Sequence, residues 1–246
     1  MKLRTLLLFV IVLCINSISY SQIGIKIGPM FGLTSPTVDY TGDVKDFYSG
    51  TKYGLRSGMN FGAMGKVTLG PLNGRISIGY ASLDNTGVAD PSNPNSTGEI
   101  NNSLFMFTLG TEFGFVIPAS PVKPYAGIDI LFSSISGSFT FHDASHVNSD
   151  VENSIKSSSR TGLGLSVGSE VAFGKIFTLD LSLRYNLINL FGQEFTNVAN
   201  ANRIDSYVSL NDAGDPAYSA GDAKHPIGND RTIATIVLQV GILFGF

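Results

Sequence analysis

The C-terminal segment Arg231–Phe246 alternates residue by residue in a way that constrains the fold more than any other part of the chain. It reads RTIATIVLQVGILFGF. On one parity, from Ala234 to Phe246, every side chain is apolar, and the opposite parity holds small and polar residues such as Thr235 and Gln239. Because successive strand residues point to opposite faces, this segment predicts a long β-strand with one apolar and one mixed face.

The N-terminal residues predict export. Lys2 and Arg4 precede the apolar stretch 6–15, and the small residues 19–21 have the spacing that a signal peptidase needs. We expect cleavage after Ser21, which removes residues 1–21 as a signal peptide and leaves residues 22–246 as one domain.

The single cysteine, Cys14, lies inside this signal segment. Leu13 before it is not the small residue that a lipoprotein signal requires. The mature chain is therefore expected to have no thiol, disulfide or lipid anchor, and cysteine-based catalysis is excluded.

Eight segments have a period-2 pattern or a length that predicts β-strands. They are Ile23–Leu33, Tyr53–Leu69, Arg75–Leu83, Ser103–Ile117, Pro124–Ile135, Thr161–Phe173, Phe177–Ile188 and Thr232–Phe246. Three connections, 70–74, 118–123 and 174–176, are short, and four, 34–52, 84–102, 136–160 and 189–231, are long and polar. This alternation predicts an all-β fold, an eight-stranded antiparallel up-and-down transmembrane β-barrel with turns at one end and long loops at the other.

Charged residues within the predicted strands share parity with the small and polar residues. These nine are Lys26, Arg56, Lys66, Arg75, Glu112, Asp129, Glu170, Asp180 and Arg184. One face of the predicted strands is thus apolar and uncharged, and the opposite face is polar. This indicates lipid outside the barrel and a polar lumen inside. Because an eight-stranded barrel is just wide enough for side chains to fill it, we expect these charges to form a lumen network of ion pairs.

On these patterns the mature chain resembles the small outer-membrane β-barrels of the OmpA/OmpX/OmpW type and the generic outer-membrane β-barrel domain families. The resemblance implies a bacterial outer-membrane location, periplasmic turns, extracellular loops and a monomer surrounded by outer-membrane lipid. It also implies that the barrel assembly machinery reads Phe244 and Phe246 as an insertion signal. The chain has no Trp, so the interfacial girdle is expected to use Tyr80, Tyr125 and Tyr185.

Two other folds remain open. A secreted β-sandwich or a lipocalin-like soluble barrel would bury the apolar face and solvate the polar one. A ten-stranded barrel would need an extra hairpin around Arg203–Leu210, which shows some alternation, but residues 211–230 carry many turn-forming residues.

The loops offer weak signals for chemistry. His142, Ser145 and His146 lie within five residues of each other but match no hydrolase motif, and two loop histidines without a third ligand are a poor metal site. We therefore expect no catalytic site, no metal and no cofactor. The long loops are acidic and no basic patch occurs, so nucleic-acid binding is disfavoured.

The favoured function is a structural or surface-recognition barrel, with a plugged polar lumen and long acidic loops that meet an unidentified extracellular ligand. The alternative is a narrow pore or transport barrel for small or apolar solutes. A lipid-modifying enzyme is a distant third.

Overall fold

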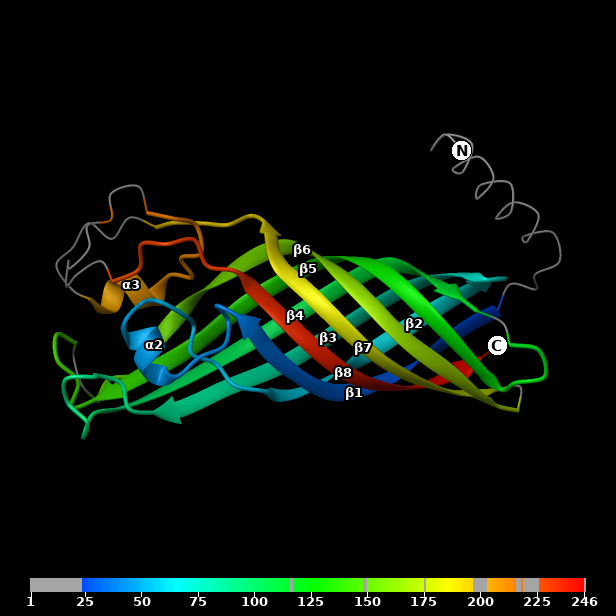
Figure 1. Cartoon of the computed structure of the whole chain (residues 1–246), viewed down its shortest axis with the longest axis horizontal. Coiled ribbons are helices and arrows are strands. Elements are labelled where there is room, and N and C mark those ends of the chain that lie inside the picture. The colour runs from blue at the N-terminus through cyan, green and yellow to red at the C-terminus, as the bar shows by residue number, and fades with distance from the viewer. Residues whose placement is uncertain are drawn as a thin grey trace.

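A computed structural model describes residues 24–115, 117–147, 150–174, 176–196, 203–215, 218 and 226–245. Within these ranges the strands are β1 (Gly24–Val38), β2 (Gly58–Leu69), β3 (Leu72–Gly87), β4 (Thr97–Gly114), β5 (Val122–His142), β6 (Asn153–Phe173), β7 (Phe177–Phe191) and β8 (Ile233–Gly245). They pair antiparallel in sequence order, and β8 returns to β1 to close the barrel (Figure 1). The predicted eight-stranded up-and-down barrel is confirmed. Residues 1–21 and the proposed cleavage position lie outside the described residues.

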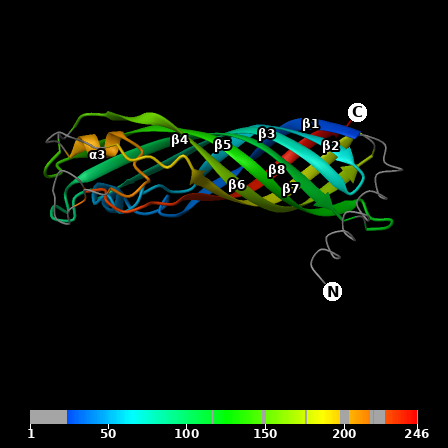
Figure 2. The same ribbon diagram turned by 90° about the horizontal axis from the view of Figure 1, so that it is seen from above.

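The two ends of the barrel differ as the connection lengths predict. The short connections 70–71, 115–121 and 174–176 lie at the end where β1 begins and β8 ends, which we call the turn end. The long connections lie at the opposite loop end and carry two short helices, α2 (Val44–Tyr48) and α3 (Ile204–Val208). Both side views show an elongated barrel with these helices gathered at the loop end (Figures 1 and 2).

Several strands extend further toward the loop end than the sequence predicts. β5 continues from Ile135 to His142, and its partner β6 begins at Asn153. Much of the predicted long loop 136–160 is therefore a paired hairpin arm, interrupted by a bulge between Ile135 and Gly137.

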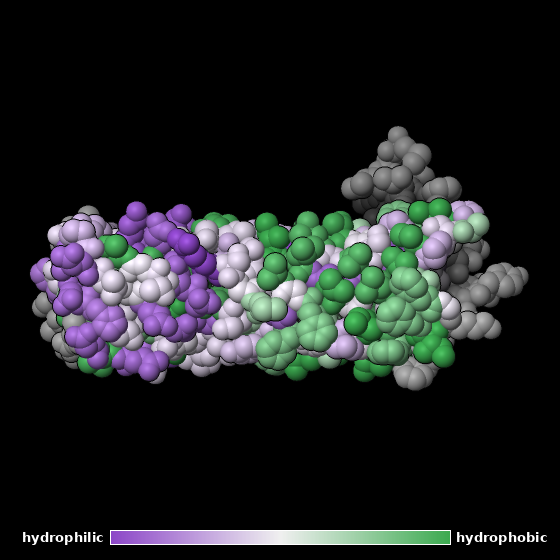
Figure 3. Space-filling model, turned by 90° about the horizontal axis from the view of Figure 1, so that it is seen from below, coloured by the Kyte–Doolittle hydropathy of each residue, from purple (hydrophilic) through white to green (hydrophobic). Residues whose placement is uncertain are grey.

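The polarity of the two barrel faces reverses part of the way along the strands. On β5 the outward residues Ile128 and Phe132 are exposed and apolar, but the outward residues from Ser134 onward are polar. Inward, β5 carries the buried charge of Asp129 and then, toward the loop end, mainly apolar residues up to Phe141, with Ser133 as the polar exception. The hydropathy surface accordingly shows an apolar band over the turn half and a polar loop half (Figure 3).

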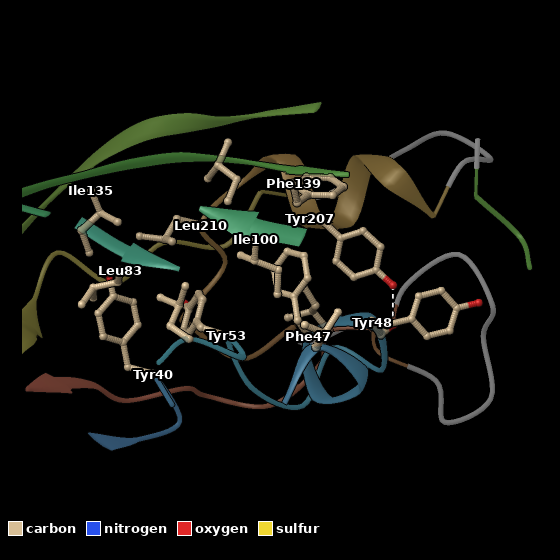
Figure 4. Close-up of a cluster of buried hydrophobic side chains, with 14 of the residues drawn as sticks. Tyr40, Phe47, Tyr48, Tyr53, Leu83, Ile100, Ile135, Phe139, Tyr207 and Leu210 are labelled. Atoms are coloured by element: carbon tan, nitrogen blue, oxygen red, sulfur yellow. Dashed lines mark hydrogen bonds between the residues drawn. The ribbon is translucent and has the colours of Figure 1, made fainter. Parts of the chain in front are cut away.

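The interior of the loop half is an apolar core. It joins strand residues to loop residues, among them Tyr40, Phe47, Tyr48, Tyr53, Leu83, Ile100, Ile135, Phe139, Tyr207 and Leu210 (Figure 4). The ring of Phe47 from α2 lies 5.1 Å from that of Tyr207 in α3 and 5.4 Å from that of Phe139 on β5. Residues 39–57 and the described parts of 203–232 therefore fill the barrel mouth, and we call them the loop plug.

The segment that could have formed an extra hairpin belongs to this plug. Ile204–Val208 is helical, and Ser209 after it is buried. Its apolar residues face the core. Packing in the plug therefore explains the alternation in the sequence, and no additional membrane strand is needed. Among the described residues, no helix has the length and apolarity to cross a membrane.

Candidate functional site: the barrel interior

The interior of the turn half contains a dense cluster of buried charges. Lys66 on β2 is fully buried, and its Nζ atom lies 2.8 Å from Glu112 Oε2, 3.0 Å from Glu170 Oε1 and 2.6 Å from Asp180 Oδ2. Lys26 on β1 adds a contact of 2.5 Å to Glu170 Oε2 near the turn end. Lys66 thus joins carboxylates from β4, β6 and β7.

The cluster continues toward the middle of the barrel through two arginines. Arg75 on β3 donates from Nη1 to Glu112 Oε1 at 2.6 Å, and its Nε and Nη2 atoms both donate to the carboxylate of Asp129. Arg184 on β7 shares Asp129, with 3.0 Å between Nη2 and Oδ2. Charge-assisted pairs of this kind are the strong hydrogen bonds of protein interiors.

Inward glycines leave the space that these side chains occupy. A Cβ atom on Gly110 would overlap Asp129 Oδ1, and one on Gly168 would lie 2.5 Å from the hydroxyl of Tyr125. Both distances are shorter than real carbon contacts. The charged layer therefore requires glycine, with no side chain, at these two positions.

Eight of the nine charges predicted to face the lumen lie in this cluster: Lys26, Lys66, Arg75, Glu112, Asp129, Glu170, Asp180 and Arg184. Arg56 does not. Its side chain is 67% exposed and pairs with Asp43 in the loop plug, with 3.4 Å between Nη2 and Oδ1. The prediction was wrong because β2 begins at Gly58, so strand parity does not extend to residue 56.

Sequence reasoning also misplaced Tyr125 and missed Lys123. Tyr125 is only 3% exposed, and its hydroxyl lies 2.9 Å from Asp180 Oδ1 beneath the ammonium of Lys66, so it belongs to the interior rather than the girdle. It shares the parity of Asp129, which was the available signal. Lys123 lies inside β5, although it was assigned to a turn, and its Nζ donates to the carbonyl of Gly70 at 3.4 Å.

A small cavity lies inside the barrel beside Arg184 of the charge cluster. Its volume is about 20 Å³, and its lining combines polar residues such as Asn60, Asn186 and Gln239 with the apolar Met106. A cavity of this size has room for about one water molecule, and these polar groups could bind it.

A second buried ion pair anchors the loop plug to the barrel wall. Arg160 on β6 donates from Nε and Nη2 to the two carboxylate oxygens of Asp212, each at 2.8 Å. Asn189 on β7 donates to the same carboxylate at 2.8 Å and to the carbonyl of Arg231, also at 2.8 Å. Asp212 lies in the longest connection and is completely buried.

The loop segments are also tied to one another. The hydroxyl of Tyr207 and Nη2 of Arg203 both donate to the carbonyl of Tyr48, the former as drawn in Figure 4. The guanidinium of Arg231 lies 3.9 Å from the centre of the Tyr53 ring. Burial raises the pKa of the Tyr53 hydroxyl to about 12, although the charge of Arg231 opposes this shift.

A buried carboxylate joins the second and third long connections. Asp90 accepts hydrogen bonds from the backbone N–H of Ser92 at 2.9 Å and of Ser145 at 3.0 Å. Burial alone would raise the pKa of Asp90, but these hydrogen bonds and that from the Ser92 hydroxyl hold it well below its ordinary range.

Of the histidines that the structure describes, His142 ends β5 and His146 follows in the loop, and they do not come together in one site. His142 is exposed and contacts Asp150, whereas His146 has a left-handed backbone with φ of 60°. Among the described residues, no group of three or more His, Cys, Asp and Glu side chains could hold a metal ion.

Phe244, one of the two residues expected to signal assembly, lies on the outer face at the turn end. It is partly exposed, is paired in register with Ile27, and its ring lies 6.2 Å from that of Phe177. Phe246 lies outside the described residues.

A closed antiparallel barrel with an apolar outer band and a charged interior defines the class of transmembrane β-barrels. The sequence profile described as outer membrane protein beta-barrel domain matches residues 5–210. The chain belongs to this family, which places it in the bacterial outer membrane. No curated protein matches the sequence.

Solved structures with a similar fold are small outer-membrane proteins. Neisserial surface protein A is 16% identical with a TM-score of 0.46, over 92% of this chain and 98% of that one. OprG from Pseudomonas aeruginosa is 13% identical with a TM-score of 0.47, over 92% and 97%. A major outer membrane protein from Thermus thermophilus is 13% identical with a TM-score of 0.49, over 92% and 100%. At sequence identities this low, the similarity shows the fold alone.

Proposed function

We propose that this protein is a closed, non-enzymatic surface barrel. Its interior does not conduct, and its loop end faces the exterior and serves a structural or recognition role. The barrel assembly machinery inserts it as a monomer, after a signal peptide of residues 1–21 is removed.

The presence of two closures in series carries this proposal. The turn half is filled by paired charges around Lys66 and Arg75, and the loop half is filled by the apolar core and the loop plug. A solute would have to break buried ion pairs and then displace packed aromatic rings. Buried pairs are costly to break, because each partner left behind is an uncompensated charge.

One observation favours the alternative of a transport barrel for small or apolar solutes. The chamber in the loop half is apolar and is filled partly by loop residues, such as Phe47 and Tyr207. Displacement of the plug would expose an apolar compartment above the charge cluster. The buried Arg160–Asp212 pair opposes such a displacement.

Conductance in a planar lipid bilayer tests the proposal. We expect no channels from the intact protein and none from Arg75→Ala or Glu112→Ala, since the loop plug still closes the other half. Stable channels whose ion selectivity changes in either variant would contradict it and establish a conduit through the cluster.

Cell fractionation with intact-mass measurement tests location and processing. The expected result is recovery in the outer-membrane fraction with the mass of residues 22–246. Recovery in the soluble periplasm, or a mass that retains residues 1–21, would contradict this part of the proposal. Protease treatment of whole cells should cut only at the loop end if that end is extracellular.

A further inference from the structure

The outer face of the barrel above the apolar band carries a wall of serines. Six of them lie on three adjacent strands: Ser103 on β4, Ser134, Ser136 and Ser138 on β5, and Ser157 and Ser159 on β6. We call these six residues the serine wall. Those on β4 and β5 and Ser159 point outward, because neighbours of the opposite parity, such as Leu104, Ile135 and Arg160, are buried. Ser157 lies at the bulge between β5 and β6 and is itself exposed.

The strand register brings these hydroxyls side by side. Ser103 is paired with Ser136 across β4 and β5, and Ser134 with Ser159 across β5 and β6. The hydroxyls of Ser134 and Ser157 form a hydrogen bond, with 3.1 Å between their Oγ atoms. Residues opposite each other on one face of a sheet lie close enough to contact a shared partner.

The wall is continuous with the membrane-facing surface. On β5 the outward series passes directly from Phe132 to Ser134, and on β4 from Phe105 to Ser103. The Tyr80 hydroxyl, at the edge of the apolar band, lies 2.7 Å from the Ser103 hydroxyl. Tyrosines commonly mark the level where the apolar interior of a membrane meets its headgroups. The serine wall therefore begins at the headgroup level and rises above it.

The chemistry of the wall selects among the groups at that level. A serine hydroxyl both donates and accepts hydrogen bonds, as a sugar hydroxyl does. The flanking charges of Glu99 on β4 and Lys156 on β6 have opposite signs, so the wall carries no cationic field that would favour phosphate.

We propose that the serine wall binds the saccharide that extends above the lipid anchor of an outer-leaflet glycolipid. The acyl chains of that lipid would lie along the apolar band below, around Phe105 and Phe132, and its sugars would pair with the serine hydroxyls. This inference rests on the proposed extracellular position of the loop end, but not on the proposed role of the loops or on a non-conducting interior, so the protease and bilayer experiments above test those points separately.

Binding of lipopolysaccharide to the full-length protein in detergent, measured by native mass spectrometry, tests the proposal. The probes are intact lipopolysaccharide and the same preparation hydrolysed to its lipid anchor. We expect the intact form to bind more tightly, and S134A/S157A to reduce this advantage by about five- to tenfold, since each exposed hydrogen bond contributes modestly. The affinity for the lipid anchor should not change.

A matched control carries S35A/S57A, which removes another bonded pair of hydroxyls, 2.8 Å apart, from the β1–β2 side of the barrel. It should keep the saccharide advantage, and all variants should retain the heat-resistant migration of a folded barrel. Equal binding of the two probes by the unmodified protein would overturn the proposal. Equal losses in the serine-wall variant and the control would also overturn it.

Discussion

Arg160 and Asp212 form a two-pronged ion pair, with both bonds at 2.8 Å and both side chains fully buried, between the barrel wall and the loop plug. The two residues come from β6 and from the longest connection, 52 positions apart in the sequence. Planar guanidinium and carboxylate groups match in this geometry, which fixes orientation as well as distance. The pair holds the described part of the last long loop inside the barrel mouth.

Replacing Asp212 with Ala should release the plug. The change leaves the buried Arg160 with only the exposed carboxylate of Glu194, 3.6 Å from Nη1, as an acidic partner, and we expect a loss of about 3–5 kcal/mol in the free energy of unfolding. Urea titration in lipid vesicles measures the loss, and limited proteolysis should show new cleavage in the last long loop. Asp205→Ala, in the same loop but only half-buried, is the control and should cost less than about 1 kcal/mol.

The double variant Arg160→Met, Asp212→Leu separates the charge effect from packing. Because a buried ion pair can often be replaced by apolar side chains of similar size, it should recover most of the stability lost in Asp212→Ala. If the double variant is as unstable as Asp212→Ala, the loss does not come from an unpaired buried charge on Arg160.

Lys66→Met should destabilise the turn half of the barrel. It leaves Glu112, Glu170 and Asp180 near one another without their shared cation, and we expect a cost of about 3–5 kcal/mol in vesicle unfolding experiments. Lys45→Met is the comparison, because the Lys45–Asp43 pair is exposed and such pairs contribute at most about 1 kcal/mol. Similar losses in the two variants would argue against a tightly coupled interior cluster.

The sequence predicts the turn half of this barrel well because lipid and lumen impose opposite requirements on the two strand parities. Alternation around Ile128 and Asp129 therefore gives both the strand and the direction of each side chain. Tyr125 could have been placed by the same reasoning, since it shares the parity of Asp129. Its aromatic character led to the girdle assignment, although its hydroxyl bonds to Asp180 inside the barrel.

The loop half could not be predicted by the same rule, because here the outer face is polar and the inner face is apolar. Above Phe132 the outside meets polar surroundings and the inside packs against the loop plug, so serines face outward and residues such as Phe139 face inward. A switch of the apolar parity near Ser134 was the signal for continued strand structure. The Arg160–Asp212 pair leaves no local pattern, because only the closed fold brings these residues together.

We predict that Phe246→Ala lowers the amount of protein inserted in the outer membrane while leaving export intact. Phe244 lies on the outer face of β8, which closes the barrel against β1, and we propose that both phenylalanines are read during insertion. Surface labelling together with the amount of processed protein in the periplasm measures the effect. Phe246→Leu provides the comparison, and equal, mild effects of both substitutions would indicate an apolar contact rather than an aromatic signal.

Alkaline conditions should open the loop plug before they disturb the membrane-spanning half. Burial raises the pKa of Tyr53 to about 12, from an ordinary value of about 10, and burial also raises the pKa of Tyr40 and Tyr207. Below about pH 10 these hydroxyls are protonated in both the closed and the open plug, so their stabilising contribution is complete. Between about pH 10 and 12 the open plug loses protons more readily than the closed one, and the stability of the closed state falls.

Phenolate absorbance and protease sensitivity, followed together, should show this transition. Tyr53→Phe should weaken its pH dependence, whereas Tyr218→Phe, at a ring that is 40% exposed, should leave it unchanged; identical profiles for all three proteins would show that the buried hydroxyl does not control the plug.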